Sequence, residues 1–121
     1  MGQALSLGRL MAATRCSVRG LADTFRHEAA FRQEVVLAAV LLPTAAWLGR
    51  SPVERGMLIG AVSAVLVAEL LNTAVEKAVD RIGPEIHPLA RRAKDAGSAA
   101  VFVALVNAGI VWLLVAAARW L

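Results

Sequence analysis

The chain has 121 residues, of which 59% are hydrophobic and 18% are charged, and its mean hydropathy is +0.65. This composition excludes an ordinary water-soluble domain, and the length suits one integral-membrane domain over residues 1–121. The net charge is +4, but the basic residues flank apolar segments and form no base-reading motif. We therefore attribute them to lipid contact and membrane orientation, and we expect no nucleic-acid partner.

Residues 5–28 are predicted to form an amphipathic helix. Hydrophobic side chains cluster on one side and arginines on another: Leu10, Val18, Leu21 and Phe25 on the first, and Arg15, Arg19 and Arg26 on the second. This pattern is typical of a helix that lies in the plane of the membrane interface. The alternative is a helix of the soluble type that packs on its own protein.

The first membrane-spanning helix is predicted over residues 29–48. Its uncharged part, residues 35–48, would cover about 21 Å of a hydrocarbon core that is about 30 Å thick. The span must therefore include Arg32 and Glu34, which we expect near the inner boundary or facing protein. Pro43 can kink this helix, and Trp47 suits the far interface, where aromatic side chains collect.

After a turn at residues 49–52, a second span is predicted over residues 53–79. Four polar residues recur at helical spacing at the end of this span and just beyond it, and they share one side with Thr73: Glu69, Asn72, Glu76 and Asp80. A carboxylate inside a bilayer helix costs on the order of 2.5–3.5 kcal/mol at the centre. Ionisable residues within a membrane are therefore candidates for function, and this stripe suggests a site that binds metal or moves protons.

A polar connection is predicted over residues 80–96, followed by a third span over residues 97–118. The span would be about 33 Å long, which matches the bilayer, and Arg119 and Trp120 would anchor its end. Asn107 lies within the span, and we expect this amide to bridge helices. The fold class is thus an all-α membrane protein with one surface helix and three transmembrane helices.

The distribution of Lys and Arg predicts the orientation of the chain. Ten of the 13 fall in residues 1–34 or 77–94, and the others are Arg50, Arg55 and Arg119. Three spans place these two groups on opposite faces, so the N-terminus and the connection at residues 80–96 should be cytoplasmic. The Glu76 end of the acidic stripe then faces the cytoplasm, where nucleotides are available.

Two carboxylates are expected at one depth, near the inner interface. Glu28 lies where the surface helix turns into the first span, and Glu76 lies at the end of the second. Such a pair could hold Mg²⁺ together with substrate phosphates; the alternative is two boundary residues paired with Arg or Lys. Glu69 is deeper. A structural hydrogen bond between helices would contribute only about 0.6 kcal/mol, so a general-base role is the better interpretation.

The connection after the second span is rich in polar residues: Glu85, His87, Arg91, Arg92, Lys94 and Asp95. Lys94 can act as a point charge on phosphate. Asp95 either belongs to the same site or caps the third span by accepting a hydrogen bond from the amide of Gly97 or Ser98. No His or Cys partners support zinc at His87. The sequence contains no GxxxxGK[ST] phosphate loop, so phosphoryl chemistry would need another arrangement.

Three segments resemble the prokaryotic diacylglycerol kinase family. They are residues 28–34 (EAAFRQE), 69–83 (ELLNTAVEKAVDRIG) and 93–100 (AKDAGSAA). The resemblance covers most of the chain, residues 9–120, with the same order of surface helix and three spans. It implies a homotrimeric helical bundle in the bacterial inner membrane. It also implies a lipid kinase that transfers the γ-phosphate of Mg²⁺-bound ATP to diacylglycerol and forms phosphatidic acid.

The resemblance further implies roles for individual residues. Glu69 would be the general base, and Asn72 would position groups beside it. Glu28 and Glu76 would hold the metal and the nucleotide. The nucleotide side would also include Arg9, Glu85, His87, Lys94 and Asp95. The lipid path would be lined by Arg9, Ala30, Phe31, Arg32, Gln33, Glu34, Trp47, Arg55, Glu69, Ser98 and Trp112.

One departure and two alternatives accompany this interpretation. Cys16 stands where a familiar family member has tyrosine, and a thiol cannot stack on a nucleotide base as a phenol ring can. Undecaprenol kinase is similar and phosphorylates a polyprenol, but the close match of residues 28–34 favours diacylglycerol. A non-enzymatic three-span pore or scaffold would explain the basic flanks, but not the co-facial acids at graded depth.

Overall fold

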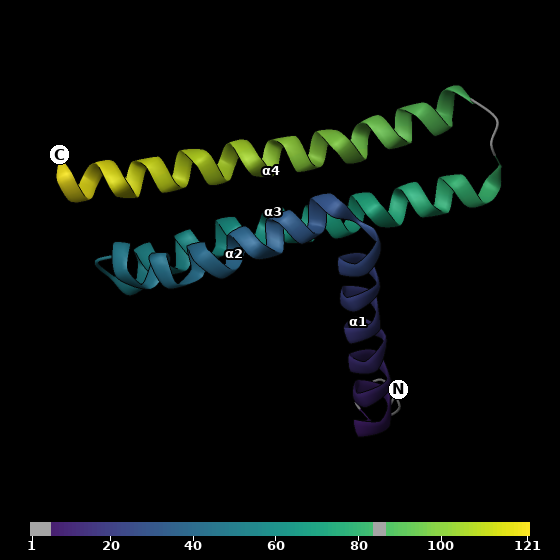
Figure 1. Ribbon diagram of the computed structural model, residues 1–121, viewed down its shortest axis with the longest axis horizontal. Coiled ribbons are helices and arrows are strands. Elements are labelled where there is room, and N and C mark those ends of the chain that lie inside the picture. The colour runs from purple at the N-terminus through teal and green to yellow at the C-terminus, as the bar shows by residue number, and fades with distance from the viewer. Residues whose placement is uncertain (1–5, 84–86) are drawn as a thin grey trace.

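The computed structural model describes residues 6–83 and 87–121, and all regular structure in this part of the chain is helical. The helices are α1 (Leu7–His27), α2 (Ala29–Leu48), α3 (Pro52–Ile82) and α4 (Pro88–Trp120). Three of them, α2, α3 and α4, run lengthwise alongside one another, whereas α1 leaves the group crosswise (Figure 1). Packing is most extensive between α3 and α4, and α2 also packs on α3. The predicted all-α architecture is confirmed.

Each of α2, α3 and α4 is long and apolar enough to cross a membrane, as the sequence predicted. Two boundaries differ from the prediction, because α3 continues to Ile82 and α4 begins at Pro88. The polar connection expected over residues 80–96 is therefore wrong for most of its length. Pro88 occupies the first turn of α4, where its missing N–H costs no hydrogen bond.

The corner between α1 and α2 is made by one residue and held by an arginine. Glu28 has extended backbone angles, φ −114° and ψ 110°, between two helices. The Arg32 guanidinium donates hydrogen bonds to the carbonyl oxygens of Phe25 and Arg26, at 3.0 and 2.9 Å. Because the last carbonyls of a helix lack partners within it, these bonds satisfy the end of α1 and fix the direction in which the chain turns.

The turn between α2 and α3 lies at the opposite end of the three long helices. Ser51 caps α3 by accepting a hydrogen bond from the amide of Glu54 at 3.1 Å, and Pro52 follows in the first turn. Gly49 is buried there, and a Cβ at this position would lie 2.5 Å from Cγ of Arg55. The turn therefore requires glycine for close packing. Pro43 lies inside α2 without ending it.

A small hydrophobic core lies toward this turn. Its buried members are Ala45, Leu48, Leu58 and Val115, with Val111, Trp112 and Ala116 packed against them. Most other large hydrophobic side chains are exposed, including Val36 and Val40 on α2 and Leu113 and Leu114 on α4. In water such exposure would be costly. It is the expected surface for helices that contact lipid chains or other membrane helices.

Arg119 joins the ends of α2 and α4. Its guanidinium donates hydrogen bonds to the carbonyl oxygens of Trp47 and Leu48, both at 3.2 Å. The same group lies 4.7 Å from the centre of the Trp47 ring and 5.8 Å from that of Trp120, and the two rings are 6.0 Å apart. This cluster satisfies carbonyls at the end of α2 and places two indole rings where the sequence predicted the far interface.

Candidate active site

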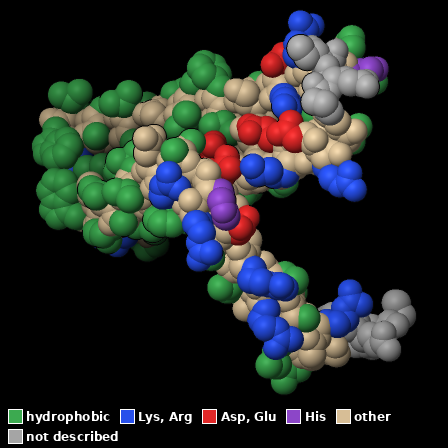
Figure 2. All heavy atoms as spheres, turned by 45° about the vertical axis from the view of Figure 1, so that its right-hand side comes forward, with side chains coloured by type: hydrophobic (Ala, Val, Ile, Leu, Met, Phe, Trp, Pro, Cys, Tyr) green, Lys and Arg blue, Asp and Glu red, His purple; other side chains and the backbone are tan. Residues whose placement is uncertain are grey.

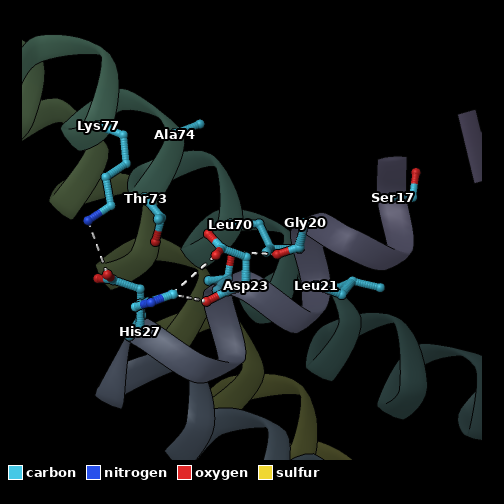
Figure 3. A pocket seen from close by; sticks show the side chains of 11 residues that line it. Ser17, Gly20, Leu21, Asp23, His27, Leu70, Thr73, Ala74 and Lys77 are labelled. Carbon is cyan, nitrogen blue, oxygen red and sulfur yellow. Dashed lines mark hydrogen bonds and ion pairs between the residues drawn. The ribbon is translucent and has the colours of Figure 1, made fainter. Parts of the chain in front are cut away.

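A cleft of about 820 Å³ lies where the α1–α2 corner approaches the middle of α3. It is lined by Ser17, Gly20, Leu21, Asp23, Thr24 and His27 of α1, by Glu28 at the corner, and by Leu70, Thr73, Ala74 and Lys77 of α3. Figure 3 shows Lys77 reaching from α3 toward the corner, and Thr73 from the same helix lies beside it. Clefts of this size commonly hold ligands as large as a nucleotide.

The acidic stripe on α3 runs beside this cleft. Among the described residues, Glu69 is the one charged side chain that is buried, with 8% of its surface exposed. Just under one turn further on, the Asn72 amide donates a hydrogen bond to the Glu76 carboxylate at 3.0 Å. Glu69 lies within electrostatic range of Glu76 and Glu28, and Glu34 of α2 lies within range of Glu69. The fold thus gathers four carboxyl groups from α2, the corner and α3.

Figure 2 shows this gathering from outside. Acidic side chains lie near the junction of α1 with the long helices, with Lys and Arg around them, and the far end of the bundle is mostly hydrophobic on this face. On this face the acidic side chains therefore lie toward the α1 side of the bundle, away from its hydrophobic end. A protein that acts on both a water-soluble, charged ligand and a membrane-embedded one needs a polar region next to an apolar one.

Three buried polar atoms near α3 and α4 have no hydrogen-bond partner within the described chain. They are Glu34 Oε2, Asn72 Oδ1 and Trp112 Nε1. The Asn72 amide oxygen faces Gly97 of α4, where a Cβ would collide with it. Because buried polar groups are nearly always paired in complete structures, these atoms mark places where a ligand, water or another protein chain would bind.

Glu28 and Glu76 are the two carboxylates that the sequence predicts to hold a nucleotide-bound magnesium ion. Residues 6–83 and 87–121 contain no group of three His, Cys, Asp or Glu side chains close enough to hold a metal by themselves. Glu28 does reach α3, because its Oε2 lies 3.3 Å from Nζ of Lys77, the residue after Glu76. An oxygen-only pair suits Mg²⁺, which usually binds one or two carboxylates and takes its other ligands from phosphates and water. The residues present therefore fit the metal only together with a nucleotide.

Three of the residues predicted on the nucleotide side lie at the start of α4: His87, Lys94 and Asp95. Lys94 Nζ forms an ion pair with Asp80 Oδ1 at 2.6 Å, which joins α4 to α3. His87 caps α4 by accepting a hydrogen bond from the amide of Leu89 at 3.0 Å. The alternative that Asp95 caps the third span is wrong, because α4 starts seven residues earlier, at Pro88. Glu85 lies outside the described residues.

The predicted lipid-path residues are spread along the bundle. Phe31 is buried beside the corner, whereas Ala30, Gln33 and Ser98 are exposed in the single chain. Trp47, Arg55 and Trp112 lie toward the other end, where Arg55 donates a hydrogen bond to the carbonyl oxygen of Ala46 at 3.1 Å.

Several predicted residues are therefore far from one another in a single chain. Arg55 precedes Glu69 by 14 residues, which is about 21 Å along α3. Arg9 lies near the free end of α1, about 28 Å from the corner along the helix. The fold gathers Glu28, Glu34, Glu69, Asn72 and Glu76 but does not bring Arg9, Arg55 or Trp112 to them.

The cleft contains residues that the sequence analysis did not single out. On α1, the side chains of Asp23 and His27 pair at 3.2 Å, and Thr24 lies between them. On α3, Lys77 lies four residues after Thr73, which the sequence had placed on the side of the acidic stripe, and both line the same wall. A spacing of four residues predicts that the two side chains lie on the same face of a helix. The approach of α1 and the corner to α3, which puts both pairs in one cleft, is a tertiary arrangement that no local sequence pattern predicts.

Comparison with known proteins gives consistent similarities. A family model described as prokaryotic diacylglycerol kinase matches residues 15–116. The diacylglycerol kinase of Haemophilus influenzae is 47% identical over 112 residues, which cover 93% of this chain and 95% of that protein. Those of Pseudomonas aeruginosa and Escherichia coli K12 are 48% and 44% identical over 106 residues. These cover 88% of this chain and 86% and 87% of the relatives.

Proposed function

Because the chain belongs to the prokaryotic diacylglycerol kinase family and is therefore a multi-pass membrane lipid kinase, we propose that its substrate is diacylglycerol, phosphorylated by ATP to phosphatidic acid. The reaction takes place at the cytoplasmic face of the bacterial inner membrane, and the whole chain acts as one kinase domain. The observation that carries this proposal is the burial of Glu69 among apolar helices, beside an open cleft and other carboxylates. The names of the relatives support the choice of lipid.

Glu69 is the general base of the reaction. Its carboxylate accepts the proton of the lipid hydroxyl as that oxygen attacks the γ-phosphorus. A new oxygen–phosphorus bond forms, the bond from the γ-phosphorus to the bridging oxygen breaks, and ADP leaves. Asn72 positions this chemistry, because its amide holds Glu76 on the same helix face. Glu34 of α2 lies within electrostatic range of Glu69 and would line the lipid path beside it.

The metal and nucleotide are held by side chains at the corner and at the cytoplasmic ends of α3 and α4. Glu28 and Glu76 provide oxygen ligands, and Mg²⁺ when bound offsets the phosphate charge during transfer. Lys94 supplies a positive charge at the same end of α3, where it now pairs with Asp80. The remaining nucleotide-side residues are Arg9, Glu85, His87 and Asp95.

The lipid path runs from the corner along the bundle. Ala30, Phe31, Arg32, Gln33 and Glu34 begin α2 and lie on the headgroup side, with Ser98 on α4. Trp47, Arg55 and Trp112 lie toward the far end, where a lipid whose headgroup is at Glu69 would extend its acyl chains. The distance of about 21 Å between Glu69 and Arg55 is thus consistent with both belonging to one lipid's path.

The working form of the enzyme is a homotrimer with cytoplasmic N-termini. A partner would supply the walls that the single chain lacks, because the membrane-length stretch of α4 has only 6% of its residues buried. It would also satisfy the three unpaired buried atoms near α3 and α4. Helix α1 lies on the membrane surface, with Leu10, Val18 and Phe25 exposed along it for lipid contact.

The test of this function is a phosphorylation assay on lipid mixtures. Purified protein in detergent, with Mg²⁺ and labelled ATP, receives diacylglycerol and undecaprenol together, and products are identified by mass. We expect phosphatidic acid as the main product. Undecaprenyl phosphate as the main product would replace the proposed substrate, and no labelled lipid at all would contradict the function.

A further inference from the structure

Lys77 lines the cleft, and its ammonium lies beside a carboxylate that we propose to bind the nucleotide-bound metal. Lys77 Nζ is 3.3 Å from Glu28 Oε2, and the pair joins α3 to the α1–α2 corner. Lys77 is the one Lys or Arg among the described residues that line the cleft. It also directly follows Glu76, so its ammonium contacts one member of the proposed metal-binding pair and is attached next to the other.

The ion pair between Lys77 and Glu28 is weak, so Lys77 can exchange Glu28 for another anionic partner. The Lys77 side chain is 66% exposed and that of Glu28 is 25% exposed, and ion pairs in such surroundings contribute about 0–1 kcal/mol. A lysine ammonium is a compact charge on a flexible stem, and it binds phosphate readily as a point charge. Lys77 can therefore leave Glu28 and reach other oxygens in the cleft without disturbing either helix.

The other charged groups of the cleft are already engaged. Asp23 and His27 pair with each other at 3.2 Å on α1, as the dashed lines in Figure 3 show together with the Lys77 contact. Lys94, the cation that the sequence analysis assigned to phosphate, is held by Asp80 at 2.6 Å and does not line this cleft. The charge balance of Glu28 therefore depends on Lys77.

We propose that Lys77 is an internal counter-charge of the nucleotide site. It neutralises Glu28 when no metal is present, and it contacts the phosphates of the nucleotide when the metal takes over Glu28. This inference rests on the proposed function, because it assumes that Glu28 and Glu76 hold a nucleotide-bound metal. It adds a phosphate-binding residue to that site and explains how two neighbouring carboxylates tolerate an incoming polyanion.

Equilibrium dialysis of labelled ATP against detergent-solubilised protein tests the inference without lipid or turnover. The variants are Lys77→Gln, which removes the charge, and Lys77→Arg, which keeps it. Arg81→Gln is the matched control, because it removes one positive charge four residues further along α3, outside the residues that line the cleft. Each protein is measured once with chelator and once with Mg²⁺.

The expected signature is a loss that depends on metal. Lys77→Gln should weaken metal-free ATP binding by about five-fold, because phosphates would then face an uncompensated Glu28. With Mg²⁺ the loss should be about two-fold. Lys77→Arg and Arg81→Gln should remain near wild type in both conditions.

Three outcomes would overturn the inference. They are equal losses with and without metal, wild-type binding by Lys77→Gln, and a wild-type protein that binds ATP only when Mg²⁺ is present. If the wild-type enzyme still phosphorylates diacylglycerol in a separate assay, only the role of Lys77 is lost. If the wild type binds no ATP in either condition, the proposed function falls with it.

Discussion

Single side chains at the corner and on α3 decide what the site can do. The helical spacing of Glu69, Asn72 and Glu76 was visible in the sequence, and the structure adds the neighbours that spacing cannot give. Glu28 pairs with Lys77, and the Asn72 amide donates a hydrogen bond to Glu76. Each carboxylate of the proposed metal pair is therefore held by a different partner, and each can be tested separately.

Glu28→Gln and Glu76→Gln are each expected to raise the Mg²⁺ concentration needed for half-maximal rate by roughly ten-fold or more. An amide has one oxygen ligand without charge, so it binds a hard cation less well than a carboxylate does. The measurement is a Mg²⁺ titration of lipid phosphorylation at saturating ATP. Glu54→Gln, at the far end of α3, serves as the control. Unchanged titrations in both mutants would contradict the shared metal site.

At the scale of helices, the hydrophobic patterns in the sequence predicted which segments form helices, but not how those helices pack against one another. The three spans and the break at Glu28 followed from local chemistry, because apolar runs and polar corners are sequence properties. The predicted connection over residues 80–96 was wrong for most of its length, because its charged residues suggested a loop where α3 and α4 are helical. The Lys77–Glu28 contact depends on how the α1–α2 corner approaches α3, which is a tertiary property that no local pattern contains.

Arg119 is expected to hold α4 against the end of α2. Arg119→Ala removes two hydrogen bonds to backbone carbonyls and the contacts with two indole rings. The free energy of unfolding should fall by about 1–3 kcal/mol, which thermal unfolding in detergent, followed by circular dichroism, would detect.

Arg50→Ala is the matched control at the same end of the bundle. Arg50 pairs with Glu54 at 3.5 Å and is half-exposed, so the loss should be under about 0.5 kcal/mol. Equal melting temperatures for the two variants would show that the Arg119 cluster does not join the helices.

At the scale of the whole molecule, one chain does not provide a partner for every polar side chain within its membrane-spanning helices. Asn107 was expected to bridge helices, yet it is exposed on α4 in one chain. Its amide would have no partner in lipid, and an unpaired amide there is costly. In a homotrimer the same amide can bind a neighbouring protomer, which agrees with the exposed face of α4.

We therefore expect a particle of three 12.7 kDa chains, and we expect Asn107→Leu to weaken it. Each lost interhelical hydrogen bond contributes about 0.6 kcal/mol, so the trimer should dissociate at lower denaturing-detergent concentration. Native mass spectrometry measures both properties. Leu105→Val, which changes an exposed apolar residue about 200° around the same helix from Asn107, should leave the trimer unaffected. An active monomer would contradict this assembly.

The most direct test of the account is the rate of phosphate transfer to diacylglycerol by Glu69→Gln. This change removes the base and alters little volume, so the rate should fall by about 10²-fold or more, while ATP binding and the trimer remain as in wild type. Glu54→Gln on the same helix should keep its rate. A Glu69→Gln enzyme that works at a near-normal rate would contradict the central claim, that a buried carboxylate activates the lipid hydroxyl.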